Sequence, residues 1–410
     1  MKIPAFCLTL CAAMGLVAQE LPLHERIVVF PPGAKPIGPY SPGIIAGDFL
    51  YVSGQGSRTP SGEIPAGFEA QTRQCLDNVK SIVTEAKLTM EHVVYIQVYL
   101  EDTANYDVMT KVLGEYFPKT PPARATLGVY KMPTSTPIEI NAVAVRKLSM
   151  KKPVVPAGYK SPSPITPGIL AGDRLYLSGF LGRDPVTGVI PADPAAQVQL
   201  ALNRMKETLA AADMDFSNMV FINPYLTKNM PADVMNRVYA KHFEWGNTPA
   251  RATIPVNALP MGANIEFTGV AIGDRSKRGA VRPKNMPPSP TASPCVLADD
   301  TLYCSAKSGF IPGANGGIHA EDVENQVRQT MRNLLDGLEE AGLDFSHVVA
   351  SNVYLDNLDD FAKMNGVYGK YFTRIPPTRT TVSPLPPVSR TRNSQGHWPK
   401  LEEISIIAVK

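Results

Sequence analysis

The feature that most constrains this chain is a long pattern that occurs in it three times. The string SPGIIAGDFLYVSGQ at 41–55 returns as TPGILAGDRLYLSGF at 166–180 and as SPCVLADDTLYCSAK at 293–307. The string TPPARATLGV around Arg124 returns as NTPARATIPV around Arg251 and as IPPTRTTVSP around Arg379. Arg124 and Arg251 are 127 positions apart. A repeat of that length is a whole domain rather than one turn of a solenoid.

The repeats predict three tandem domains in one chain. We place them at 24–148, 153–273 and 284–410, with boundaries in the Pro- and Lys-rich stretches near 148–163 and 274–290. The 410 residues are 44% hydrophobic and 19% charged, which is a globular composition and excludes disorder or a coiled coil for the whole chain. A net charge of +3 gives no reason to expect nucleic acid or an anionic membrane as a partner.

The sequence of each copy predicts an α+β domain. The turn residues Gly47-Asp48 separate two β-rich runs and predict a hairpin. Apolar residues at helical spacing follow over about 68–86, then a strand at 92–100 and a second helix at about 106–117. Two final strands are expected at 123–130 and 138–145. The result is a mixed sheet with two helices.

The strand at 92–100 and its two counterparts predict how the domains associate. Two helices cover one face of a sheet, and the alternating set Val94, Ile96, Val98, Leu100 is uniformly apolar. The other set combines apolar residues with one amide and a closing tyrosine: Val93, Tyr95, Gln97, Tyr99, then Met219, Phe221, Asn223, Tyr225, then Val348, Ala350, Asn352, Tyr354. Such a face is typical of an interface. We therefore expect a monomeric pseudo-trimer closed as a ring, with three separate beads as the alternative. Pro224 predicts an edge strand or a bulge in the second copy.

The N-terminus predicts export. Lys2 precedes an apolar stretch from Ile3 to Val17, and a small residue, Ala18, stands before polar Gln19. This pattern is typical of a signal peptide at 1–18, and the apolar run is short for a membrane span. The protein is then secreted or periplasmic, with no membrane association after cleavage. A lipoprotein anchor at Cys11 and an uncleaved anchor are the alternatives.

The cysteines and histidines indicate no metal chemistry. Outside the leader only Cys75, Cys295 and Cys304 remain, which is too few for a disulfide framework. Cys295 and Cys304 flank the turn at Asp299-Asp300, and whether they pair is open. The six histidines lack metal-ligand spacing, and no phosphate-binding loop or nucleophile-elbow motif occurs.

Four polar positions recur in all copies: Ser53, Ser178 and Ser305; Arg124, Arg251 and Arg379; Glu139, Glu266 and Glu403; and, at the start of the first helix, Gln71, Gln197 and Gln326. An arginine where a loop enters a strand presents a planar fork that suits a carboxylate. A glutamate on an apolar strand face is partly desolvated, and its raised basicity suits it to move a proton or orient water. Two plainer alternatives stay open: the arginine and glutamate form a structural ion pair, or the serine only bonds backbone at a strand end.

These residues resemble the Rid family, also called the YjgF/YER057c/UK114 family. The matching strings are IGPYSPGIIAGDFLYVSGQ, VYLEDTANYDVM, PPARATLGV and PIEINAVAV, and the resemblance covers nearly the whole chain after residue 18. It implies a chorismate-mutase-like fold, assembled in threes with ligand clefts between the units. It also implies hydrolysis of reactive 2-imino acids to 2-oxo acids and ammonia, a small carboxylate substrate, and no metal or organic cofactor.

The resemblance carries roles onto four positions of the first copy. Arg124 would clamp the substrate carboxylate, Glu139 would position water, the Ser53-Gly54 segment would offer hydrogen bonds, and Tyr40 would line the cleft. We therefore expect Arg124, Glu139, Ser53 and Tyr40 to be the catalytic residues, with the pair Arg124 and Glu139 carrying turnover, and Gly54 to bind substrate. Substrate-binding roles pass to the matching residues of the other copies: Ser178, Arg251, Glu266, Ser305, Arg379 and Glu403.

The copies are expected to be unequal. Ile165 and Ala292 stand where the tyrosine would be, and Ala306 replaces the glycine in the third copy. Three functions compete: an imine deaminase, a carboxylate-binding protein without turnover, and a chaperone-like module that presents apolar faces.

Overall fold

The computed structural model describes residues 25–161, 165–284, 286–313 and 316–410. The expected signal peptide at 1–18 lies outside these residues. The chain forms three α+β domains, each with a mixed sheet of six or seven strands and two main helices, as the repeats predict. Among the described residues, no helix combines the length and apolarity needed to cross a bilayer.

The first domain has its strands in the order β1-β2-β3-β6-β4-β5. β4 and β5 are parallel, and the other pairs are antiparallel. Its elements are β1 Ile27–Val29, β2 Gly43–Ala46, β3 Phe49–Gln55, α1 Phe68–Glu85, β4 Val93–Leu100, α2 Tyr106–Tyr116, β5 Ala123–Gly128 and β6 Ile138–Val145.

The second and third domains repeat this order. The second contains β7 Lys151–Val154, β8 Gly168–Ala171, β9 Arg174–Leu181, α3 Pro194–Ala210, β10 Met219–Leu226, α4 Ala232–Tyr239, β11 Ala250–Arg251, β12 Ile254–Pro255 and β13 Ile265–Ile272. The third contains β14 Arg278–Val281, β15 Cys295–Ala298, β16 Thr301–Lys307, α5 Val323–Glu340, β17 Val348–Leu355, α6 Phe361–Tyr368, β18 Thr378–Val382 and β19 Glu402–Val409.

The expected hairpin lies between β2 and β3 and recurs in each domain. Its turn begins at a residue with positive φ: Gly47 at 55°, Gly172 at 62° and Asp299 at 58°. Glycine adopts this conformation without steric cost, and aspartate tolerates it better than most residues do.

The stretches in which the boundaries are expected each contain a strand that starts the next sheet, because β7 pairs with β8 and β14 pairs with β15. The sheets of the second and third domains therefore begin at Lys151 and Arg278, within the expected boundary stretches 148–163 and 274–290.

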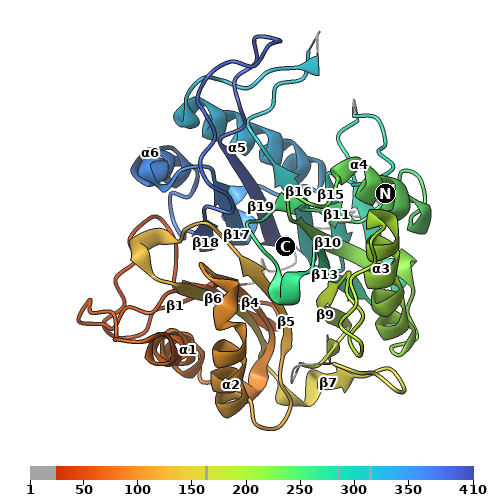
Figure 1. Ribbon diagram of the computed structural model, residues 1–410. Coiled ribbons are helices and arrows are strands. Elements are labelled where there is room, and N and C mark those ends of the chain that lie inside the picture. The colour runs from red at the N-terminus through yellow and green to blue at the C-terminus, as the bar shows by residue number, and fades with distance from the viewer. Residues whose placement is uncertain (1–24, 162–164, 285, 314–315) are drawn as a thin grey trace, which may run out of the picture.

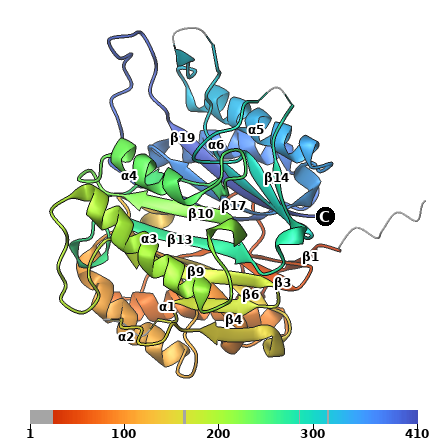
Figure 2. The ribbon, with the colours of Figure 1, turned by 90° about the vertical axis from the view of Figure 1, so that its right-hand side faces the viewer.

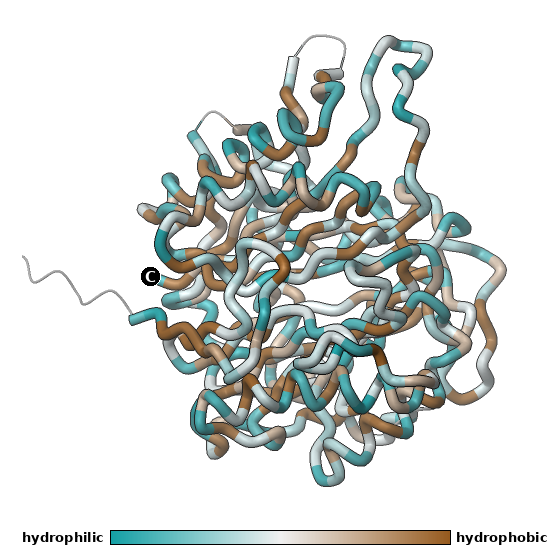
Figure 3. The backbone as a smooth tube through the Cα atoms, turned by 90° about the vertical axis from the view of Figure 1, so that its left-hand side faces the viewer, coloured by the Kyte–Doolittle hydropathy of each residue, from teal (hydrophilic) through white to brown (hydrophobic). Residues whose placement is uncertain are grey.

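The helices cover the outside and the sheets face one another in the centre (Figure 1; Figure 2). Each domain has its own apolar core between its helices and its sheet. A fourth core joins residues of all three sheets, including Tyr99, Tyr225 and Tyr354. Apolar residues gather along the interior strands, and the exposed helix surfaces are more hydrophilic (Figure 3). The expected ring is therefore confirmed in place of separate beads.

The predicted interface face is largely confirmed. The amides of Gln97, Asn223 and Asn352 line a central chamber of about 90 Å³ between the three sheets. At the start of β4, β10 and β17, the residue predicted to face the interface is the wrong one, and its neighbour faces it instead. A β-bulge at each of these places shifts the register. Val94, Val220 and Val349 belong to the shared core, and Val93, Met219 and Val348 pack beneath the helices of their own domains.

Neither alternative expected for Pro224, an edge strand or a bulge, is found there, because β10 has a neighbour on each side and its register shift against β13 falls between Met219 and Phe221. Pro224 pairs with Phe267 inside the sheet, and on its other side the neighbouring strand is broken into β11 and β12. Proline has no N–H to donate to that neighbour, which accounts for the break at this level of the sheet.

The shared core is not threefold symmetric. Phe49, Arg174 and Thr301 occupy equivalent positions at one end of it. The guanidinium of Arg174 is buried, donates to the Ala298 carbonyl and lies 3.2 Å from Asp300. Three arginines around one axis would repel one another, so this arrangement requires three different domains rather than three copies of one.

Candidate active site

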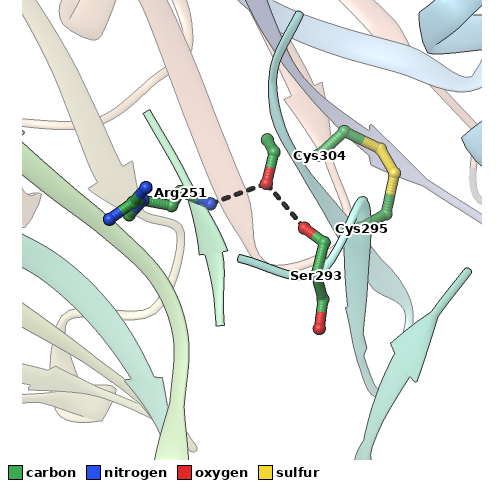
Figure 4. The surroundings of a disulfide bond; sticks show 5 residues. Arg251, Ser293, Cys295 and Cys304 are labelled. Carbon is green, nitrogen blue, oxygen red and sulfur yellow. Dashed lines mark hydrogen bonds between the residues drawn. A yellow bond between two sulfur atoms is a disulfide. The ribbon is translucent and has the colours of Figure 1, made fainter. Parts of the chain in front are cut away.

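The three domain junctions share one hydrogen-bond motif. The backbone N–H of each recurring arginine donates to the recurring serine of the next domain: Arg124 to Ser178 at 2.9 Å, Arg251 to Ser305 at 2.8 Å, and Arg379 to Ser53 at 3.1 Å. Figure 4 shows the second of these junctions, where Arg251 lies near Ser293 and near the disulfide between Cys295 and Cys304. Because the third contact joins the last domain to the first, the ring is closed.

The motif favours the plainer alternative for the serines, hydrogen bonds to backbone, over the expected catalytic role of Ser53 and the expected substrate-binding roles of Ser178 and Ser305. Each hydroxyl also donates to a backbone carbonyl of its own domain, at Ser41, Thr166 or Ser293. Ser53 is 1% exposed. A buried hydroxyl that already donates and accepts has little left for a substrate, so these serines hold the junctions together.

The ring also corrects the expected catalytic pair. Arg124 and Glu139 lie in different clefts, because each arginine faces the glutamate of the following domain. Arg379 and Glu139 line one cleft, which we call cleft A, and Arg124 and Glu266 line a second, cleft B. Arg251 and Glu403 define the third cleft, cleft C. Their proximity is indicated by the pKa of Arg251, which burial lowers and the nearby charge of Glu403 raises.

The guanidinium of Arg379 is surrounded by aromatic rings. It lies 5.3 Å from the ring centroid of Tyr40, 5.4 Å from that of Phe361 and 5.1 Å from that of Tyr368. Arg379 is 4% exposed, yet no described carboxylate lies within 4 Å of it. The open alternative of a structural ion pair between arginine and glutamate is therefore wrong for cleft A. A buried cation without an anion is suited to an anionic ligand.

Glu139 is placed by a β-bulge in β3. Ser53 and Gly54 together lie opposite Asn141, because the register shifts between Val52 and Gln55. A Cβ on Gly54 would come within 2.0 Å of the Glu139 Oε1 atom. Glycine is thus required for the carboxyl group to lie against the bulge.

Burial raises the pKa of Glu139 to about 8, and the positive charge of Arg379 acts weakly against this shift. Near neutral pH the group is therefore mainly a carboxylic acid, which can donate a proton. Within the described residues the Glu139 side chain forms no hydrogen bond, so it can bond to a ligand or to water in the cleft.

Cleft A has a volume of about 490 Å³. Tyr40, Gly54, Glu139 and Arg379 all line it. The Tyr40 oxygen accepts a hydrogen bond of 3.3 Å from the backbone N–H of Ile37, and burial raises the pKa of its hydroxyl. Four of the sequence-predicted residues are brought together here, although one of them comes from a different copy than expected.

Cleft B has the same plan with different walls. Arg124 donates to the hydroxyl of Tyr106 at 2.8 Å, and a Cβ on Gly179 would come within 2.0 Å of Glu266 Oε1. Burial raises the pKa of Glu266 to about 8, although the Thr126 N–H donates to it at 3.3 Å. The volume is about 40 Å³.

Cleft C lacks this arrangement. Ala306 replaces the glycine, so its methyl group occupies the space that a glutamate fills in the other clefts. Glu403 pairs with Lys400 instead. Arg251 donates to the Asn236 side chain at 2.7 Å. The expected inequality of the copies thus has a specific structural basis.

Cys295 and Cys304 form a disulfide between β15 and β16, which answers the question left open by the sequence. The disulfide fits against α5 because residue 337 is a glycine. A Cβ atom at this position would lie only 2.6 Å from the Cys295 sulfur. The equivalent helix positions hold Ile82 and Thr208, which pack instead against the glycines Gly43 and Gly168. The disulfide links β15, which begins two residues after Ser293, to β16, which carries Ser305 at cleft C (Figure 4).

Sequence reasoning missed the aromatic residues around the arginines. Tyr106 and Phe361 both begin the second helix of their domain, and Tyr368 lies on the inner side of α6. An aromatic residue recurring at this helix start in two of the three copies is the signal that was available.

A family model described as Endoribonuclease L-PSP matches residues 32–146, 159–273 and 285–387. A RutC family protein of Pyrococcus horikoshii is 42% identical over 123 residues, which is 29% of this chain and 98% of the relative. The 2-iminobutanoate/2-iminopropanoate deaminase of Escherichia coli K12 is 38% identical over 115 residues, covering 27% of this chain and 90% of the relative.

Among solved structures, the YjgF gene product of E. coli is 36% identical and covers 30% of this chain and 99% of its own, with a TM-score of 0.29. Each of these relatives corresponds to a single domain of this chain.

Proposed function

Since this chain belongs to the Rid (YjgF) family, with three matched copies that span most of its length, we propose that it hydrolyses 2-imino acids to 2-oxo acids and ammonia in cleft A. The observation that carries the proposal is the pair in that cleft: a buried Arg379 without an acid partner, and a buried Glu139 without a hydrogen-bond partner among the described residues. A deaminase of 2-iminobutanoate and 2-iminopropanoate is among the relatives.

The first step is binding. The Arg379 guanidinium takes the substrate carboxylate as a planar fork, and the rings of Tyr40, Phe361 and Tyr368 hold its orientation. The imino carbon next to that carboxylate is then held toward Glu139, across the cleft. Holding the reacting groups in place in this way is a large part of what the site supplies.

The second step is proton transfer. Glu139 in its acid form donates a proton to the imine nitrogen, which makes the carbon more electrophilic. Water adds to that carbon and forms a C–O bond. The Glu139 carboxylate accepts the proton that the water loses and delivers it to nitrogen. The C–N bond then breaks and ammonia leaves. The Glu139 carboxylate accepts the proton of the new hydroxyl group, so that the C=O bond of the 2-oxo acid forms and the acid form of Glu139 is restored. No covalent bond to the protein is needed.

We also propose that the protein acts after export, with residues 1–18 as a cleaved signal peptide. The Cys295–Cys304 disulfide supports this placement, because disulfides persist in the oxidising compartments outside the cytoplasm.

The test is to add the protein to freshly generated 2-iminobutanoate and follow loss of the imine above the rate in buffer. Arg379→Gln and Glu139→Gln should each lower kcat/KM by roughly 100-fold. Arg251→Gln is the matched change in cleft C and should leave the rate within about twofold. A wild-type rate equal to that of buffer, or full activity in Arg379→Gln, would contradict the proposal. Binding of 2-oxobutyrate without turnover would instead identify a carboxylate-binding protein.

A further inference from the structure

Cleft B differs from cleft A in size and charge, although the two share one plan. Its volume is about 40 Å³, against about 490 Å³ in cleft A. Two further arginines, Arg183 and Arg204, line cleft B together with Arg124. Three guanidinium groups therefore line this one cleft.

The extra arginines occupy positions that are used differently in the first domain. Arg204 lies seven residues after Gln197, and the residue seven positions after Gln71 is neutral Asn78. Arg183 corresponds to Arg58, whose guanidinium donates to the carbonyls of Gly62 and Thr134. Compared with the first domain, the second has an additional cation, Arg204, at the position of Asn78. Among the described residues, its Arg183 donates to no backbone carbonyl of the kind that Arg58 contacts.

The contacts of both arginines leave their charges uncompensated. Arg204 lies over the Tyr159 ring at 5.5 Å from its centroid, and its Nη2 is 3.3 Å from the Tyr159 hydroxyl and 3.4 Å from the Lys160 carbonyl. Arg183 Nη1 lies 3.6 Å from the Met261 sulfur. Within the described ranges, no carboxylate lies within 4 Å of either guanidinium.

Acidic groups near the cleft offset only part of this charge. Glu266 is the sole acidic residue among the described residues that line it, and burial raises its pKa to about 8. Asp184 follows Arg183 in the chain, and its carboxylate accepts the backbone N–H groups of Val186 and Thr187. These bonds lower the pKa of Asp184, and Arg204 acts on it in the same direction, so Asp184 is an anion near Arg204. Three guanidinium groups against this one carboxylate leave the cleft with a net positive charge near neutral pH.

We propose that cleft B binds small dicarboxylates, namely 2-oxo or 2-imino acids that carry a second carboxylate on a short side chain. Arg124 takes the carboxylate next to the reacting carbon, as Arg379 does in cleft A. Arg183 and Arg204 take the second carboxylate, and they set the specificity. The inference rests on the proposed function for the choice of 2-oxo and 2-imino acids, and it divides the substrates of one chain between two clefts.

The experiment is a calorimetric titration of the whole protein with 2-oxoglutarate and with 2-oxobutyrate, in an Arg379→Gln background that removes binding in cleft A. We expect 2-oxoglutarate to bind at one site per chain and at least about tenfold more tightly than 2-oxobutyrate. Arg204→Asn and Arg183→Gln should each weaken 2-oxoglutarate roughly tenfold and change 2-oxobutyrate by less than about twofold. Lys206→Asn removes an exposed charge from the same helix and is the matched control, with no change expected.

Equal affinities for the two acids, or 2-oxoglutarate binding that survives both arginine substitutions, would overturn the proposal. Failure here is distinguishable from failure of the proposed function, because the readout is binding and needs no turnover. An inactive protein that still prefers 2-oxoglutarate would contradict only the deaminase activity, and an active one without this preference would contradict only the role of cleft B.

Discussion

The backbone N–H of Arg379 donates a 3.1 Å hydrogen bond to the hydroxyl oxygen of Ser53. The two residues belong to the last and the first domain, so this bond closes the ring. It also places the side chain of Arg379 in the cleft that contains Glu139. Closure of the fold and assembly of the proposed site therefore depend on the same junction.

Replacing Ser53 by alanine should destabilise the whole chain. The substitution leaves the Arg379 N–H without its acceptor in a buried position and removes the bond to the Ser41 carbonyl. We expect a loss of about 1–3 kcal/mol in the free energy of unfolding, measured by urea denaturation. Ser81→Ala, on the exposed side of α1, is the control and should change little. An unchanged midpoint for Ser53→Ala would mean that this junction does not stabilise the fold.

Replacing Gly54 by alanine should reduce activity without unfolding the protein. The new methyl group would occupy the position of the Glu139 carboxyl, as Ala306 does at the equivalent position of cleft C. We expect kcat/KM for 2-iminobutanoate to fall roughly 10- to 100-fold with a far-ultraviolet circular dichroism spectrum like that of the wild type. Gly179→Ala makes the same change in cleft B and should leave this activity intact. Equal losses in both variants would argue against cleft A as the site.

The activity should decline in alkaline solution. Because burial raises the pKa of Glu139 to about 8, its acid form is lost as the pH rises through that value. We expect kcat/KM, corrected for the uncatalysed rate, to be nearly constant between pH 6 and 7 and to fall about tenfold per pH unit well above pH 8. A profile that is flat to pH 10 would show that no group with this pKa acts as the acid.

Stability should also fall between about pH 6.5 and 8, because of buried carboxyl groups. Glu402 accepts hydrogen bonds from Thr330 and from the Gly309 N–H, and burial raises its pKa to about 8. A carboxyl group with a raised folded-state pKa holds its proton in the folded chain and loses it in the unfolded chain, so folding weakens as the pH rises toward that pKa. Each such group contributes a slope of up to about 1.4 kcal/mol per pH unit in this window.

Glu402→Gln should flatten this dependence, because glutamine keeps the shape of the side chain and does not titrate. The check is the urea midpoint at pH 6.5 and at pH 8 for both proteins. Glu340→Gln, at the exposed end of α5, should retain the wild-type slope. A wild-type protein that grows more stable over this range would contradict the assignment.

The disulfide should depend on Gly337. Isoleucine at this position, the residue of the first domain, would overlap the Cys295 sulfur. We expect Gly337→Ile to be at least about 2 kcal/mol less stable than the wild type or to contain free Cys295 and Cys304. Mass spectrometry of unreduced peptides and urea denaturation measure the two outcomes. Gly366→Ala, on α6, is a control whose added methyl meets no atom within 4 Å. A stable variant with an intact disulfide would show that α5 moves to make room.

Much of the fold could be predicted from the sequence. The repeats alone indicated three domains, and the pattern of Gln97, Asn223 and Asn352 on mostly apolar strand faces predicted the ring. The error at Val93 and Val94 arose because strict alternation ignores a bulge, and a bulge leaves no sign in the pattern of apolar residues. The unexpected interior position of Pro224 has a similar cause, since the break lies in the neighbouring strand.

By itself the sequence determined which residue types the site contains, because the same arginine and glutamate stand in every copy. Only the tertiary structure decided which arginine meets which glutamate, and it paired Arg379 with Glu139 and Arg124 with Glu266. The physical reason is that a local pattern describes one domain, whereas these clefts lie between domains. Which residues line a given cleft depends on the direction in which the three domains follow one another around the ring. That direction is set by packing across the shared core and by the three serine junctions.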